Sequence, residues 1–148
     1  MAQLLTLFII ANIVIWIIAI YKTSFQHQPF HITPLLAPLG IFVWGDSVIF
    51  SFFWFASASL CLYLNDFILF GLTFSVFWVI RGLGETIYWI SEQFATNHRN
   101  HPHTLIGSRI FPQDSIHFAY QIIAQTITII AILTSVYFAH LWLTVSLH

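Results

Sequence analysis

Charged residues are scarce in this chain, and their scarcity excludes a water-soluble fold. Lysine, arginine, aspartate and glutamate together make up 6% of the 148 residues, whereas hydrophobic residues make up 59%. Soluble domains carry about 25% charged residues. The mean hydropathy is +0.87. Because a soluble protein does not expose so apolar a surface, the sequence predicts an integral membrane protein whose main partner is the lipid bilayer.

Several other features are missing, and each absence excludes a class of function. The net charge is −1 and no basic run is present, which argues against a nucleic-acid partner. The single cysteine, Cys61, cannot form an intrachain disulfide. No serine nucleophile elbow, phosphate-binding loop or His-Glu-x-x-His zinc motif occurs. Haem bound by two histidines inside the membrane is disfavoured, because no histidine lies at the centre of an apolar segment.

Four apolar segments are long enough to cross a bilayer, which takes about 20 helical residues. The predicted spans are residues 2–21, 47–64, 67–94 and 115–143. Only Asn65 and Asp66 separate the second span from the third, so these two are predicted to form a tight antiparallel hairpin. The expected fold is an all-α, polytopic four-helix membrane bundle that uses residues 1–148 as a single transmembrane domain.

Lysine and arginine predict the orientation of these spans. Lys22 lies in the loop 22–46, and Arg99 and Arg109 lie in the loop 95–114. In a four-span protein these two loops share one side of the membrane, and the sequence has no lysine or arginine on the other side. The positive-inside rule therefore predicts cytoplasmic loops and two termini on the non-cytoplasmic side.

The stretch 34–44 does not fit a simple loop. It is apolar throughout although it contains Pro34 and Pro38, and it is too short to span a bilayer. Two interpretations stay open. The stretch is either a re-entrant or interface-lying segment, or a loop that packs onto the end of the bundle.

Polar residues recur at helical spacing on the third and fourth spans. They are Arg81, Glu85, Tyr88 and Glu92 on the third span, and His117, Gln121, Gln125, Thr128 and Ser135 on the fourth. Such spacing places each set on one helix face. Because the two spans run antiparallel on either side of loop 95–114, both faces are predicted to border one polar chamber in the cytoplasmic half. Asp46, at the start of the second span, is expected to border it too.

Arg81 and Glu85 are expected to form an ion pair within the membrane, one helical turn apart. Ionisable groups at this depth are expensive and normally face protein or water, so they are functional candidates by default. The functional interpretation is a site for a substrate or an ion. The structural interpretation is an ion pair that fixes helix packing.

A metal ion is the one cofactor that the sequence suggests, and the pattern is weak. Asp114 and His117 are spaced to bind a metal from one helix face, with Glu85 or Glu92 adding oxygen ligands. Asp114 as a helix cap and His117 as a polar contact fit the same pattern. Three histidines within residues 97–103 are either transition-metal ligands or part of a solvated loop.

Three functional hypotheses follow. The polar faces and the stretch 34–44 favour a transport or channel module for a small solute or ion, slightly ahead of the others. Because the outer half of the spans has few polar residues, a full pore would need a homo-oligomer. The second hypothesis is a membrane-embedded enzyme at the cytoplasmic interface. In it, either Glu85 or Glu92 acts with His117 as general acid, base or metal ligand, and Arg81 holds an anionic group such as a lipid phosphate. The third is a structural subunit of a larger membrane complex.

Overall fold

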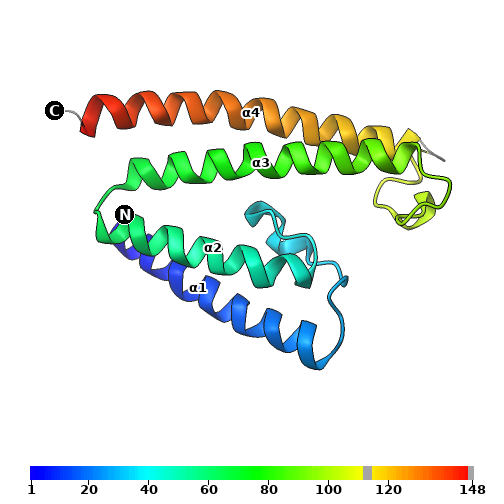
Figure 1. The fold of residues 1–148 in the computed structure, drawn as a ribbon, viewed down its shortest axis with the longest axis horizontal. Helices are drawn as coiled ribbons and strands as arrows, with labels where there is room; N and C mark the ends of the chain where they lie inside the picture. Colours follow the sequence, from blue (N-terminus) through cyan, green and yellow to red (C-terminus); the bar gives the residue numbers. More distant parts are fainter. Residues whose placement is uncertain (112–114, 147–148) are drawn as a thin grey trace. The chain divides into compact units, whose positions relative to one another are not determined.

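Four long helices dominate the computed structural model, which describes residues 1–111 and 115–146 (Figure 1). They are α1 (Ala2–Ile20), α2 (Trp44–Tyr63), α3 (Phe67–Gln93) and α4 (Ser115–Ser146). In this described part of the chain, all four are long and apolar enough to cross a membrane. The predicted all-α fold with four spans is therefore confirmed, and the protein is an integral membrane protein by the length and composition of its helices.

The start of α2 differs from the prediction by three residues, because Asp46 reaches back along the chain. Its Oδ2 accepts the backbone N–H of Phe42 at 3.2 Å, and the helix follows the extended residue Val43. An acidic side chain in the first turn also interacts favourably with the positive end of the helix dipole. Asp46 is thus the third residue of α2, and the helix begins about one turn before the predicted start at residue 47.

The chain forms two compact units, Met1–Thr73 (unit 1) and Phe74–His148 (unit 2), and α3 contributes to both. Within unit 1, α1 and α2 run antiparallel (Figure 1). The buried residues of α1 recur every seven positions, and those of α2 alternate steps of four and three. They are Leu5, Asn12 and Ala19 on α1, and Ser47, Ser51, Trp54, Ala58 and Cys61 on α2. This heptad spacing with mostly small residues is typical of closely packed membrane helices.

The connection between α2 and α3 is the predicted tight turn. Asn65 adopts a left-handed conformation, with φ of 53°. Asp66 then caps α3, because its Oδ1 accepts the backbone N–H of Leu69 at 2.8 Å. The first residues of α3 return onto α2, where Phe70 packs against the core that includes Cys61. This confirms the hairpin for the part of α3 that belongs to unit 1.

The apolar stretch 34–44 packs against α2. It opens with the short 3₁₀ helix Pro34–Leu39, and Gly40 turns the chain with a left-handed φ of 73°. Ile41 is fully buried, and the indole Nε1 of Trp54 donates a hydrogen bond to the Leu39 carbonyl at 2.9 Å. The stretch is therefore anchored to unit 1 at its end, through Leu39 and Ile41, while its depth in a bilayer stays a prediction.

Unit 2 pairs α3 with α4, and the two helices approach each other closely at Gly82. A Cβ atom at Gly82 would lie 3.3 Å from the Cβ of Thr128 and even closer to its hydroxyl, whereas a Cβ at Gly84 would meet open space. The Thr128 hydroxyl is satisfied within α4, because it donates to the Ala124 carbonyl at 2.8 Å. Only the first of the two glycines is thus required by the packing.

Candidate metal centre

Glu92 is a buried carboxylate at the end of α3, and the loop that follows folds back over it. Its side chain is 6% exposed. One carboxylate oxygen accepts the backbone N–H of Arg99 at 3.3 Å, and the other accepts that of Asn100 at 3.0 Å. These bonds satisfy the charge and bring the beginning of the histidine-containing stretch 97–103 onto the helix.

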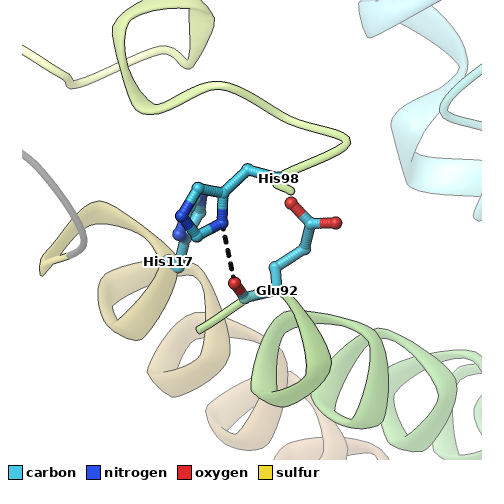
Figure 2. Close-up of side chains that lie close together, drawn as sticks. All are labelled: Glu92, His98 and His117. Carbon is cyan, nitrogen blue, oxygen red and sulfur yellow. Dashed lines mark hydrogen bonds between the residues drawn. The ribbon is translucent and has the colours of Figure 1, made fainter. Parts of the chain in front are cut away.

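His98 is the first ring in this returning loop. Its Nδ1 lies 2.9 Å from the backbone carbonyl of Glu92 (Figure 2). A carbonyl oxygen only accepts hydrogen bonds, so Nδ1 carries the proton in this contact. In the neutral imidazole, Nε2 of His98 is then the nitrogen with the lone pair that a metal ion requires.

His117, in the first turns of α4, is completely buried at 0% exposure. Its Nε2 lies 3.0 Å from the backbone carbonyl of Asn100 and therefore carries the proton in this contact. Its Nδ1 has no hydrogen-bond partner among the described residues. A buried polar atom without a partner costs about 1–3 kcal/mol, so this nitrogen marks a position where a ligand would restore the lost interaction.

The three side chains come together at the loop end of α3 and α4 (Figure 2). One potential ligand atom from each of Glu92, His98 and His117 lies within 4.8 Å of the others. Two imidazoles and one carboxylate suit divalent first-row transition metals such as Zn²⁺ and Fe²⁺. Zinc bonds of about 2.1 Å would hold neighbouring ligand atoms about 3.4 Å apart, so the group would have to contract around an ion.

The surroundings of the two histidines resemble those of metal ligands in general. Metal-bound histidines usually donate their second ring N–H to a carboxylate or a backbone carbonyl, which fixes the tautomer and the ring orientation. His98 and His117 each make such a contact, with the carbonyls of Glu92 and Asn100. With these contacts in place, Nε2 of His98 and Nδ1 of His117 are the ring nitrogens that could ligate an ion.

Aromatic rings pack beside this group. The indole of Trp89 stacks on His117 with ring centroids 6.0 Å apart and planes inclined by 25°. Tyr120 lies on Trp89 with centroids 4.6 Å apart, and the rings of His98 and His117 are 4.9 Å apart. The imidazole of His117 is therefore in contact with both a second histidine ring and a tryptophan ring.

The predicted ion pair is confirmed. Arg81 and Glu85 are 3.1 Å apart, and both side chains are largely buried. The second carboxylate oxygen of Glu85 accepts the indole N–H of Trp89 at 3.1 Å. Glu85 lies about two turns from Glu92 along α3, and it is joined to Arg81 and Trp89 instead of to the three-residue group.

Other residues of the predicted chamber have separate neighbours. The Tyr88 hydroxyl accepts a hydrogen bond from the side-chain amide of Asn100. The side-chain amide of Gln93 on α3 donates a hydrogen bond to the side-chain oxygen of Gln121 on α4 at 2.6 Å. Gln125 is half-buried, one turn further along α4. These contacts join the ends of α3 and α4 to the loop between them.

Two further predicted residues lie outside the described part of unit 2. Asp46 lies in unit 1, in the first turn of α2, and Asp114 lies outside the described residues. The predicted metal set shares Glu92 and His117 with the observed group, and the structure adds His98. The sequence indicated His98 only as one of three loop histidines, because periodicity says nothing about the path of an irregular loop.

Comparison with known proteins assigns no family and no function to this chain. No protein-family model, no curated protein and no solved structure matches the chain. The fold and the site together define an all-α integral membrane protein with a buried cluster of two histidines and one glutamate at one end of a helix pair.

Proposed function

We propose that this protein is a membrane-embedded metalloenzyme whose centre binds one divalent transition-metal ion through Glu92, His98 and His117. The observation that carries the proposal is the buried Nδ1 of His117, which has no hydrogen-bond partner among the described residues, on a ring beside the other two side chains. Among the described residues the group offers three protein ligands, which would leave at least one coordination position open; this is the pattern of catalytic metal sites, whereas structural zinc sites use four protein ligands.

The two histidines and the glutamate have different roles in this proposal. His98 and His117 supply neutral nitrogen ligands, and their backbone contacts hold the rings in the required tautomers. Glu92 supplies a negative charge that partly neutralises the cation. The bound ion would act as a Lewis acid or activate a water molecule. Its substrate would be reached at the membrane surface, because the site is formed by helix ends and a loop.

The transport hypothesis has less support within unit 2. A path between α3 and α4 would have to pass Gly82 and Thr128, where the helices are so close that even a Cβ atom on the glycine has no room. A purely structural role would call for a fully paired polar network, and the Nδ1 of His117 has no partner among the described residues. We therefore favour the metalloenzyme over both alternatives.

The positive-inside rule supports a cytoplasmic position for this centre. Lys22, Arg99 and Arg109 all lie in the two long loops. Cysteines introduced at Asn65 and His103 in intact cells or oriented vesicles should react with a membrane-impermeant thiol reagent from opposite sides. Reaction of both from the same side would contradict this topology. The native Cys61 is buried and should contribute little labelling.

Metal binding tests the proposal directly. The full-length protein would be purified in detergent, stripped with a chelator and titrated with Zn²⁺ or Co²⁺, with bound metal measured by mass spectrometry. We expect one ion per chain. His117→Ala and His98→Ala should weaken binding by more than about 100-fold, beyond the 10–100-fold effect of residues outside the ligand set.

A matched control comes from the same loop. His103 is an exposed histidine that is not part of the three-residue group. His103→Ala should leave the stoichiometry and the affinity unchanged. If the wild-type protein takes up no ion, or if His117→Ala and His103→Ala bind equally well, the metal centre is not formed by these residues and the proposed function fails.

A further inference from the structure

A continuous series of contacts runs along α3 from the intramembrane ion pair to the metal-ligand group. Arg81 contacts Glu85 at 3.1 Å, and Glu85 accepts the indole N–H of Trp89 at 3.1 Å. The same indole stacks on the ring of His117. Each residue in the series thus touches the next, and the last is the buried His117, whose Nδ1 has no hydrogen-bond partner within the part of the chain that the structure describes.

The first two contacts fix the indole. A hydrogen bond to an ionised acceptor is shorter and stronger than one between neutral groups, and low polarity strengthens it further. The carboxylate of Glu85 is itself held, because one oxygen binds Arg81 while the other accepts from Trp89. The plane of the Trp89 ring is therefore set by a charged pair that cannot easily move into lipid.

The fixed indole in turn limits the orientation of His117. Rotation about the side-chain bonds of His117 would carry the imidazole out of its near-parallel stack with Trp89, in which the two ring planes are inclined by 25°. The contact between Nε2 and the Asn100 carbonyl defines the second direction. Together the two contacts determine where Nδ1 points, and a metal ligand must be held closely to its productive geometry.

We infer that Arg81, Glu85 and Trp89 are positioning residues for the metal centre, acting through the stacked ring on His117. This inference rests on the proposed function, because it assigns these residues a role in metal binding. It also gives a reason for the presence of an ion pair whose burial costs desolvation free energy. The ion pair fixes the indole of Trp89, and the indole in turn fixes the ring of His117.

The mildest test replaces Trp89 with phenylalanine. This change keeps an aromatic ring against His117 and removes the N–H that Glu85 accepts. Residues outside the ligand set typically change metal affinity by about 10–100-fold. Because Trp89 makes no hydrogen bond to His117, we expect the low end of that range, about a 10-fold loss of Co²⁺ affinity. The visible spectrum of bound Co²⁺ should change as well, since it reports ligand geometry.

A double variant tests the ion pair without leaving a lone charge in the membrane. Arg81→Leu combined with Glu85→Leu should lower Co²⁺ affinity about as much as Trp89→Phe, near the low end of the outer-residue range of about 10–100-fold. Adding Trp89→Phe to the double variant should cause little further loss, because residues that act through one contact are not additive. Trp78→Phe is the matched control, since Trp78 lies on the same helix and packs on Phe77.

The readouts separate positioning from mere stability. Thermal unfolding of the metal-free variants measures structural damage, while the affinity and the spectrum of Co²⁺ measure the ligand arrangement. If Trp89→Phe and the double variant bind Co²⁺ with the affinity and spectrum of the wild type and Trp78→Phe, the inference is wrong while the metal centre stands. If the wild type itself binds no ion, the proposed function has failed instead.

Discussion

Unit 1 and unit 2 bury different kinds of polar residue. The buried polar residues of unit 1 are neutral, namely Asn12, Thr33, Ser47 and Ser51, whereas unit 2 buries Glu92 and His117 beside Ser75 and Thr128. Small neutral side chains allow membrane helices to approach closely and to exchange hydrogen bonds. Ionisable groups are expensive in the same surroundings and indicate a functional site. The contrast separates a neutral packing seam from the proposed metal centre.

Both units contain buried atoms without a hydrogen-bond partner among the described residues, and these atoms differ in what would satisfy them. In unit 1 they are Asn12 Oδ1 and Ser51 Oγ. Asn12 lies level with Ser51 in the antiparallel pair, as the neighbouring contact of Phe8 with Trp54 indicates. A hydroxyl can donate a hydrogen bond and an amide oxygen can accept one, so each of these two groups has a partner of the right kind on the facing helix. His117 Nδ1 is an acceptor whose group contains no comparable hydroxyl, so a metal ion fits it better.

The largest expected effect comes from the charged pair of unit 2. Arg81→Leu should destabilise the protein by about 3–5 kcal/mol, because it leaves the Glu85 carboxylate buried without its counter-ion. The double change to leucine at both positions should be clearly less harmful. Unfolding of the detergent-solubilised protein, followed by circular dichroism, would measure both. Equal stability of the single and double variants would show that the two charges do not depend on each other.

A smaller effect is expected at the closest helix approach. Gly82→Ala should destabilise by about 1–3 kcal/mol, because the added methyl group overlaps the Thr128 side chain. Gly84→Ala is the matched control, since a Cβ there meets open space and alanine favours helices by about 1 kcal/mol over glycine. The same unfolding assay compares them. A neutral result for Gly82→Ala would mean that α3 and α4 can separate without cost.

The smallest effect is expected in the neutral seam of unit 1. If Asn12 and Ser51 share a hydrogen bond, a double-mutant cycle of Asn12→Leu and Ser51→Ala should show a coupling of about 0.6 kcal/mol, the average for such bonds in membranes. Neither change should alter Co²⁺ binding. A coupling as large as that of Arg81 and Glu85 would remove the distinction between the two units, as would a loss of metal affinity.

Much of the fold could be predicted because its signals are local. Apolar length identified the four spans, the Asn65–Asp66 pair identified the hairpin turn, and a four-residue spacing identified the contact of Arg81 with Glu85. The first residue of α2 was not predicted correctly. It depends on the contact of the Asp46 side chain with Phe42 outside the helix, and helix periodicity does not report such a contact.

The sequence by itself determined the membrane class, the four helices and the presence of ionisable groups near one end of the last two, because composition and helical spacing are properties of the chain alone. Only the tertiary structure decided which of these groups meet. Glu92 binds the backbone of the following loop, and this fold brings His98 beside His117 across a stretch without regular spacing. The path of that loop depends on backbone hydrogen bonds to a buried carboxylate, and these join Glu92 to residues seven and eight positions away, a separation that helical periodicity does not report.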